Sequence, residues 1–399
     1  MEDKIGILTA GGLAPCLSSS IGGLIKKYTE FVPNAEIIGY LNGYKGLLLG
    51  DSIKITENVR KNAELLYRVG GSVLGSSRVK LTNVADCVKK GYIVEGKNPL
   101  QVAAEQLIKD GITILHTIGG DDTNIAASEL ASYLSINGYN LTVVGLPKTV
   151  DNDIIPVTQT LGAWTAAEQG AIFFENVANE NTTSSRQLII HEVMGRNCGW
   201  LTAATASEYR KGLEKKTFLS DILLTKERWD IDAIYIPELI IDLDAETERL
   251  SKLMDAKDGV NIFLSEGAGV ETITAEMEAQ GKTVHRDAFG HVRLDEINPG
   301  QWFAKKLSKV LKADKTLVQK SGYFARSAVP NKRDLNLILK TTNMAVKSAL
   351  NGQSGVIGLD EKCNDEMRCI GFQRIKDGKP FNIHAEWFQK MLRDIGQIR

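Results

Sequence analysis

The sequence has few prolines and cysteines, almost no net charge and no long hydrophobic run. Its 399 residues include 9 prolines and 5 cysteines, and 48 basic side chains are balanced by 49 acidic ones. This balance excludes a bulk positive field that would hold nucleic acid or an anionic membrane. No window approaches the roughly 18 apolar residues that a transmembrane helix needs. Any anion that the protein binds must therefore be held by a local site.

The cysteines lack the spacing of a disulfide framework or a zinc site. They are odd in number and scattered, and none forms a CxxC pair. We expect all of them to be thiols without a role, as is typical of a reducing compartment. The first residues combine charges with a short apolar run, unlike a signal or transit peptide. These features predict a cytoplasmic protein.

Short β-branched runs alternate with amphipathic stretches along the chain. Because the runs lack strict polar alternation, they are typical of strands buried on both faces. The expected strands are Lys4 to Leu8, Glu36 to Gly39, Thr113 to Ile118, Leu141 to Leu146, Leu188 to Val193, Ala233 to Ile236 and Asn261 to Ser265. The expected helices are Leu100 to Lys109, Asn124 to Leu134, Thr165 to Ala178, Thr272 to Gln280 and Leu337 to Leu350.

This alternation predicts an α/β fold with two doubly wound parallel-sheet domains flanking an active-site cleft. Ligands are then expected at the carboxyl ends of the strands. We expect the first domain to span residues 1–150, joined by a later segment near 260–300, and the second to span 151–399. The polar segment at 147–153 is the expected hinge.

Glycine is abundant, at 37 residues, and several glycines follow predicted strands. Gly11 and Gly12 follow the first strand, Gly119 and Gly120 follow another, and a loop contains Gly75 shortly before Arg78. Glycine lets backbone amides converge on an anion, and a helix N-terminus favours negative charge there. None of these loops is a Walker A loop or a GxGxxG fingerprint, so a dinucleotide-dependent dehydrogenase is excluded. The loops predict phosphate binding.

Two adjacent acids, Asp121 and Asp122, follow Gly120 at the start of a predicted helix. A helix N-cap turn formed by Asp122 or Thr123 would account for one acid. Two carboxylates beside phosphate-binding glycines would repel the phosphate unless a cation intervened. Mg²⁺ bridging Asp121 to phosphate oxygens is therefore expected.

A second polar loop follows the strand that ends at Leu146. In extended backbone, Asp151 and Asp153 would face the same side, with Lys148 and Thr149 close by. Such a loop can be turn chemistry alone. Alternatively, one Asp accepts a hydroxyl proton, the other helps to position a metal, and Lys148 neutralises charge on a transferring phosphoryl group.

Three later segments carry groups that suit a sugar phosphate. Met194-Gly195-Arg196 follows a strand. Gly195 leaves the backbone accessible, and the Arg196 guanidinium can bind phosphate or sugar oxygens with two parallel hydrogen bonds. Glu266 ends another strand and could hold sugar hydroxyls. Residues 321–334 contain Tyr323, Arg326, Lys332 and Arg333, and the default expectation for them is a solvated basic surface. His191, in the middle of a strand, is expected to be a hydrogen-bonded core residue.

Taken together, these residues resemble the phosphofructokinase family. Its first strand ends in T-[SA]-G-G near an AP pair, as Thr9 to Gly12 and Ala14-Pro15 do here. ATP-using members carry GGDGS, whereas GGDDT at residues 119–123 is similar to the pyrophosphate-using members. The family's [TS]-I-D-N-D appears at residues 149–153 after a lysine, another mark of that branch. The resemblance runs in order from residue 4 to about residue 335.

The resemblance implies Mg²⁺-dependent, reversible transfer of a phosphoryl group from pyrophosphate to the 1-hydroxyl of fructose 6-phosphate in glycolysis. Asp151 would be the proton acceptor, assisted by Lys148. Asp121 would hold Mg²⁺, with Asp153 as a second candidate ligand. Asp122 would exclude ATP by its volume and its charge.

The other implied contacts fall into two sets. The pyrophosphate contacts would be Gly11, Gly12, Arg78 and Gly120. The fructose 6-phosphate contacts would be Thr149, Val150, Asp151, Met194, Gly195, Arg196, Glu266, Tyr323, Phe324, Ala325 and Arg326. Residues 1–150 would form the pyrophosphate and Mg²⁺ domain and residues 151–399 the sugar-phosphate domain with a C-terminal packing segment. A homodimer without nucleic-acid or membrane partners is implied.

The chain departs from bacterial ATP-dependent members at two places. Their His-x-Gln-Arg-Gly segment is replaced by Gly322 to Arg326. Their Arg that reaches across a subunit interface corresponds to Gln187, so either the neighbouring Arg186 takes that role or the site is not shared. Two other functions stay open: an ATP-dependent sugar-phosphate kinase, which Asp122 and Lys148 disfavour, and a non-catalytic phosphate or nucleotide sensor, which would not need a proton acceptor.

Overall fold

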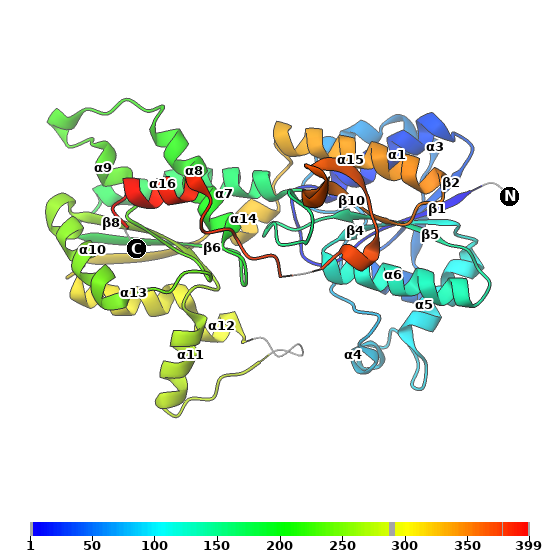
Figure 1. The fold of residues 1–399 in the computed structure, drawn as a ribbon, viewed down its shortest axis with the longest axis horizontal. Helices are drawn as coiled ribbons and strands as arrows, with labels where there is room; N and C mark the ends of the chain where they lie inside the picture. Colours follow the sequence, from blue (N-terminus) through cyan, green and yellow to red (C-terminus); the bar gives the residue numbers. More distant parts are fainter. Residues whose placement is uncertain (1–2, 287–291, 377, 398–399) are drawn as a thin grey trace. The chain divides into compact units, whose positions relative to one another are not determined.

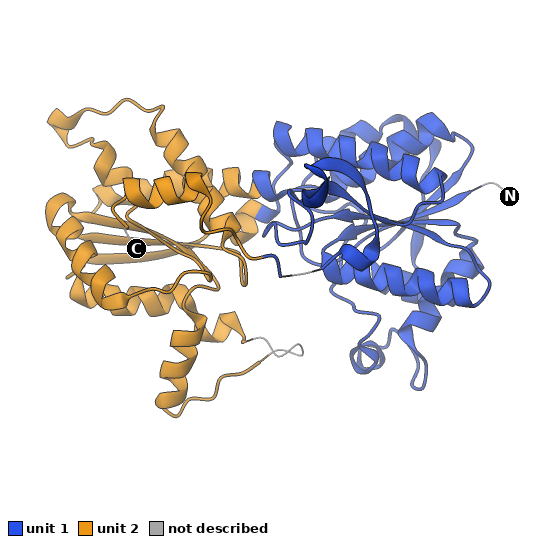
Figure 2. Cartoon of the chain, viewed as in Figure 1, with its two compact units in different colours: residues 1–165, 326–379 blue, residues 166–325, 380–399 orange. Residues whose placement is uncertain are grey.

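The computed structural model describes residues 3–286, 292–376 and 378–397, and the chain divides into two compact units. Unit 1 comprises residues 1–165 and 326–379, and unit 2 comprises residues 166–325 and 380–399 (Figure 2). Each unit has one sheet with helices on both faces (Figure 1). The predicted α/β class is confirmed. None of the helices in the described ranges combines the length and the apolar character that crossing a membrane would require.

The unit boundaries differ from the predicted domain boundaries. The first unit continues to residue 165, and the later segment that joins it is 326–379 instead of one near 260–300. The reason is strand pairing: Gly355 and Val356 pair in parallel with Val144 and Gly145, which adds a late strand to the first sheet. The chain then returns to unit 2 at residue 380.

The sheet of unit 1 has seven strands within the described residues, in the order β11-β10-β5-β4-β1-β2-β3. Their bounds are β1 Lys4–Thr9, β2 Glu36–Tyr40, β3 Ser52–Lys54, β4 Ile114–Gly119, β5 Thr142–Pro147, β10 Gly355–Asp360 and β11 Glu366–Ile370. The five central strands are parallel, but both edge strands, β3 and β11, pair antiparallel. The predicted parallel pairing is therefore confirmed for the five central strands. The two edge strands differ, because short connections from β2 and β10 return the chain beside the strand it has just left.

Helices cover both faces of this sheet. Their bounds are α1 Leu17–Phe31, α2 Tyr44–Leu49, α3 Glu57–Lys61, α4 Val84–Lys89, α5 Pro99–Asp110, α6 Asp121–Ile136 and α15 Lys332–Leu350. Helices α1 and α15 pack together on one face, and α5 and α6 lie on the other (Figure 1). Helix α5 begins where the Asn98 side chain accepts from the Leu100 amide, and it ends at Gly111 in a left-handed conformation.

The sheet of unit 2 has four strands in the described part of the chain, in the order β7-β8-β6-β9, and all pairs are parallel. Their bounds are β6 Gln187–Val193, β7 Ala233–Tyr235, β8 Gly259–Ser265 and β9 Lys315–Lys320. The remaining helices are α7 Ala163–Val177, α8 Trp200–Leu213, α9 Lys226–Trp229, α10 Leu243–Lys257, α11 Val270–Ala279, α12 Leu294–Ile297, α13 Pro299–Val310, α14 Gly322–Arg326 and α16 Glu386–Asp394. Residues of α10 and α13 share one apolar core with β6, β7 and β8.

His191 lies in the core of unit 2, as expected, but it is not held by hydrogen bonds. Its ring stacks on Phe174 with centroids 5.2 Å apart and meets Phe263 edge-on. Neither ring nitrogen has a hydrogen-bond partner among the described residues. Burial lowers the pKa of His191 to about 3, so it is a neutral aromatic core residue.

Candidate active site

Two of the predicted phosphate loops and the polar loop that contains Lys148 meet at one edge of the first sheet. Strand β4 pairs in parallel with both β1 and β5, so the carboxyl ends of these strands are neighbours. Gly11 and Gly12 follow β1, Asp121 begins the helix that follows β4, and Lys148 follows β5. The sheet topology therefore brings together residues that lie more than a hundred positions apart.

The loop that contains Arg78 is tied directly to the first glycine pair. The Gly11 amide donates to the Ser77 carbonyl at 2.9 Å, and the Ser76 hydroxyl donates to the Gly11 carbonyl at 2.9 Å. Gly11 has a φ of +86°, a conformation that favours glycine. A Cβ on Gly12 would lie 3.7 Å from Nη2 of Arg78. The exposed Arg78 guanidinium thus stands beside open backbone.

Lys148 is a buried cation beside the same glycines. Its side chain is 5 % exposed, and Nζ donates to the Gly12 carbonyl at 2.7 Å. A Cβ on Gly11 would lie only 3.1 Å from that Nζ. Burial lowers the pKa of Lys148, and the Arg78 charge lowers it further, whereas Asp151 raises it. A bound anion would relieve this unfavourable environment.

Helix α6 begins at the carboxyl end of β4. Gly120 is its N-cap residue and has no side chain to contribute, so the expectation of a cap formed by Asp122 or Thr123 is wrong. Asp121 and Asp122 both lie in the first turn. The carbonyls of Gly119 and Gly120 accept from the Asn124 side-chain amide at 3.2 and 2.9 Å, which fixes the turn. Asp122 is 61 % exposed and forms an ion pair with Lys80.

The loop after β5 is not extended, in contrast to the expectation from its alternating acids. Asn152 has a φ of +57°, and its side-chain oxygen accepts from the Thr160 amide at 2.8 Å. The Thr149 hydroxyl accepts from the Asp151 amide and donates to the Asp153 carboxylate, both at 3.1 Å. A turn held by these side chains, and not strand alternation, therefore sets the positions of Asp151 and Asp153.

In unit 2, the expected sugar-phosphate residues follow three neighbouring strands. Strand β6 lies between β8 and β9 and pairs in parallel with both. Met194 to Arg196 follow β6, Glu266 follows β8, and Tyr323 lies just after β9. The Gly195 amide donates to Oε1 of Glu266 at 3.4 Å. Burial raises the pKa of Glu266, which disfavours its charged form, whereas the hydrogen bond from the Gly195 amide and the charge of Arg196 act in the opposite direction.

Gly267 permits the close approach that places Arg196. A Cβ at residue 267 would lie 1.8 Å from the Arg196 carbonyl oxygen. Both residues line a cavity of about 910 Å³ within unit 2. The glycine is therefore required where the chain after β8 crosses the chain after β6.

If Arg196 holds the sugar phosphate, as the resemblance implies, replacing Gly267 with Ala should displace Arg196 and weaken that contact. We expect the KM for fructose 6-phosphate to rise about tenfold or more, since one misplaced charge-assisted contact is worth ~1.5–3 kcal/mol. Initial rates at varied fructose 6-phosphate measure this. Gly212→Ala is the matched control, because a Cβ at that position in α8 meets nothing within 4 Å. An unchanged KM in Gly267→Ala would contradict the role of this contact.

Some expected contact residues have side chains that face the core. Val150 and Ala325 are each 4 % exposed, so neither presents an accessible side chain. Tyr323 is 79 % exposed and Phe324 is 49 % exposed, with the Phe324 ring 5.7 Å from that of Phe173. Arg326 is the first residue of the segment that returns to unit 1.

The structure assigns Arg186 a role within unit 2. Its Nε and Nη2 donate to the carbonyls of Lys312 and Leu311 at 3.0 and 2.6 Å, and Nη1 pairs with Asp255 at 2.7 Å. Gln187 is fully buried. The Arg186 guanidinium is thus held by groups of unit 2.

Sequence reasoning missed two residues. Asp334, in the segment expected to be a solvated basic surface, is fully buried and accepts from the Gly162 amide and from both the amide and hydroxyl of Thr165. It therefore caps the start of α7, and nearby Arg333 stacks over Trp164 at 3.7 Å.

Lys80 is the second residue that the sequence analysis missed. Its position two residues after Arg78 in the glycine loop was the only signal available.

Comparison with known proteins identifies similar chains. A family model described as phosphofructokinase matches residues 4–349. A protein of Methylomonas methanica named pyrophosphate–fructose 6-phosphate 1-phosphotransferase is 60% identical over 394 residues, covering 99% of this chain and 96% of its own length. A protein of the same name from Methylotuvimicrobium alcaliphilum is 58% identical over 396 residues, covering 99% and 97%.

A solved structure has the same fold. It is the crystal structure of a pyrophosphate-dependent phosphofructokinase from Marinobacter aquaeolei, with a TM-score of 0.72 and 19% sequence identity. The match covers 99% of this chain and 91% of that one. The α/β units described above are therefore an established arrangement of strands and helices.

Proposed function

Since the chain belongs to the phosphofructokinase family, we propose that it transfers a phosphoryl group from pyrophosphate to the 1-hydroxyl of fructose 6-phosphate. The products are fructose 1,6-bisphosphate and phosphate. The observation that carries the proposal is the combination of a buried Lys148 at the glycine loops with a carboxylate at residue 122. We propose further that the enzyme is a cytoplasmic homodimer.

The donor residues of unit 1 suit a small, highly charged anion. Gly11, Gly12 and Gly120 present backbone that can approach phosphate oxygens, and Arg78 and Lys148 supply positive charge. Lys148 is removed from water, so its attraction to a phosphoryl group is screened less than that of a surface lysine. This arrangement needs no contact with a nucleoside.

The residues near α6 fit a magnesium ion carried with the donor. No three His, Cys, Asp or Glu side chains gather as a metal cage in the described ranges of the chain. Mg²⁺ prefers one or two carboxylates together with phosphate oxygens and water, and Asp121, with Asp153 as second candidate, would supply them. Bound there, the ion would neutralise charge on the phosphoryl oxygens during transfer.

Asp151 is the proposed proton acceptor for the sugar 1-hydroxyl. Its backbone amide is held by the Thr149 hydroxyl, so the carboxylate is presented from a fixed turn. Met194 to Arg196, Glu266 and Tyr323 would hold the sugar phosphate through backbone, guanidinium, carboxylate and phenol groups. Phosphate leaves from the donor as the new ester forms.

A single assay tests the proposed function. The purified protein is given fructose 6-phosphate and Mg²⁺ with either pyrophosphate or ATP, and fructose 1,6-bisphosphate is measured. We expect turnover with pyrophosphate and very little with ATP. Turnover with ATP alone would indicate an ATP-dependent kinase, and binding of pyrophosphate without turnover would indicate a sensor.

Replacing Asp122 with Gly is expected to weaken the exclusion of ATP. The change removes both volume and negative charge at the start of α6, where an α-phosphate would otherwise be repelled. We expect kcat/KM with ATP to rise at least about tenfold, since a like-charge contact costs on the order of 1.4 kcal/mol or more. Asp122→Asn, which removes charge but little volume, separates the two effects. If ATP use stays unmeasurable even when Lys148→Gly is added, the assigned role of Asp122 is wrong.

A further inference from the structure

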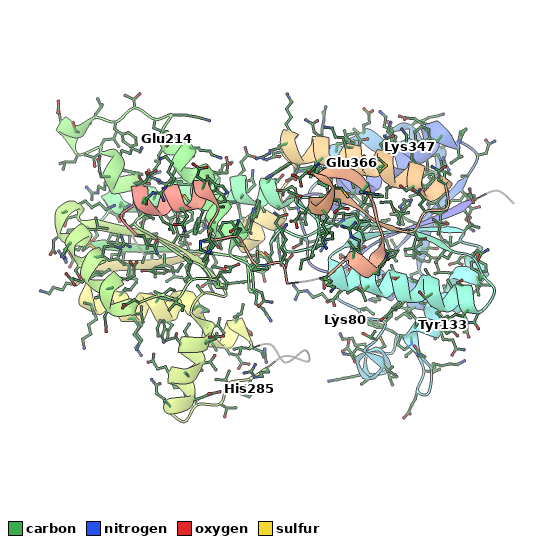
Figure 3. All side chains as sticks on the ribbon, viewed as in Figure 1. Lys80, Tyr133, Glu214, His285, Lys347 and Glu366 are labelled. Atoms are coloured by element: carbon green, nitrogen blue, oxygen red, sulfur yellow. The ribbon has the colours of Figure 1, made fainter. Side chains whose placement is uncertain are left out.

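Lys80 forms an ion pair with Asp122 that the proposed reaction does not yet explain. Its Nζ lies 2.6 Å from Oδ2 of Asp122, and its side chain is 28 % exposed. Lys80 lies in the chain between the Arg78 loop and α4, and Figure 3 labels it near α6. The pair therefore connects two of the loops that form the donor end of unit 1.

The backbone at Lys80 is held in place on both sides. Val79 and Leu81 are 7 % and 2 % exposed and belong to the core of unit 1. The Lys80 carbonyl accepts from the Asn83 amide at 3.2 Å and from the Cys87 thiol at 3.6 Å. The backbone from which the Lys80 side chain extends is therefore held in place by packing and hydrogen bonds.

The Asp122 side of the pair is equally fixed. Ala126 and Ala127 of α6 belong to the same core as Val79 and Leu81. The Tyr44 hydroxyl donates to the carbonyl of Thr123 at 2.6 Å, next to Asp122. The two ends of the ion pair are therefore attached to one packed core.

The negative charge of Asp122 would disfavour binding of pyrophosphate as well as of ATP, and the ion pair with Lys80 reduces that effect. A carboxylate that repels the α-phosphate of ATP must also repel pyrophosphate, which carries several negative charges. A cation 2.6 Å from Oδ2 offsets part of that field at the donor, while the side chain still occupies its volume. We infer that Lys80 is a positioning residue, which holds Asp122 and partly neutralises its charge, so that this side chain blocks a nucleoside while repelling pyrophosphate less. This inference rests on the proposed function.

Replacing Lys80 with Met tests the inference. Exposed ion pairs contribute little to stability, so the variant should fold. We expect the KM for pyrophosphate to rise about three- to tenfold, because a partly screened negative charge is left near the anion, with kcat within about twofold of the parent. Lys80→Arg should keep the parental KM. Lys90→Met is the matched control, since it removes a lysine from the ion pair with Asp86 on neighbouring α4.

The double variant Lys80→Met, Asp122→Asn decides how Lys80 acts. If Lys80 works by neutralising Asp122, removing both charges should return the KM for pyrophosphate to within about twofold of the parent, a non-additive result. A double variant as impaired as Lys80→Met would overturn the inference, since Lys80 would then bind pyrophosphate itself. An unchanged KM in Lys80→Met would also overturn it. The parental protein is assayed first, and absence of pyrophosphate-dependent turnover there would instead refute the proposed function.

Discussion

Asp151→Ala is expected to reduce kcat by about 10²–10⁴, the usual contribution of a positioned general base. The side chain follows β5 on a turn that the Thr149 hydroxyl fixes, and no other change to that turn is introduced. The affinity for fructose 6-phosphate should stay within a few-fold of the parent, because the guanidinium and backbone groups of unit 2 are untouched. Steady-state rates and calorimetric titration measure the two quantities.

Asp151→Asn is the companion variant. It keeps the shape of the side chain but cannot accept the hydroxyl proton, so its kcat should be as low as that of Asp151→Ala. Thermal unfolding of both variants verifies that the turn is intact. Near-parental kcat in either variant would remove Asp151 as the base, and a loss confined to KM would make it a binding residue.

Lys148→Met is expected to lower kcat by about 10²–10³, comparable to the loss of one preorganised donor to a developing charge. Its Nζ is fixed by the Gly12 carbonyl at 2.7 Å and stands beside the glycines that are expected to meet the donor. Because burial lowers the pKa of Lys148, its charged ammonium form should be lost at a lower pH than that of an ordinary lysine. Methionine has a similar length and no charge.

The stability of Lys148→Met distinguishes catalysis from folding. Replacing a buried charge with an apolar side chain of similar volume is often neutral or stabilising. We therefore expect an unchanged or higher Tm together with the loss of kcat. Lys26→Met, which disrupts an exposed ion pair with Glu64 on the same unit, is the control and should change neither quantity much. A lower Tm with unchanged kcat would make Lys148 a structural residue.

Much of the fold was predictable from hydrophobic runs. All the predicted strands are present close to their expected bounds, because each is largely buried and rich in β-branched and other apolar residues. Strands β3 and β9 were missed because their residues are exposed or half-buried, so their sequences lack that signal. Strand β10 is well buried but was also missed, and its pairing with β5 depends on a contact across two hundred residues.

The residue types expected to bind the phosphoryl donor were predictable from the sequence, but their positions in the structure were not. Glycine pairs after strands and adjacent acids indicate phosphate and magnesium chemistry whatever the tertiary structure. The alternation of Asp151 and Asp153 was misleading, since a left-handed Asn152 between them turns the chain. The contacts of Arg186 were not predictable either, because its carbonyl partners at residues 311 and 312 could not be anticipated from spacing.

The sequence by itself determined the α/β class, the residue types that bind phosphate and the family to which they point. These follow from local patterns: apolar runs, glycines at strand ends and short polar motifs. The tertiary structure alone decided that Lys148 is buried against Gly12, that Lys80 pairs with Asp122, and that residues 326–379 complete unit 1. The physical reason is that burial and ion pairing depend on groups distant in the chain, which only the packed sheet brings together.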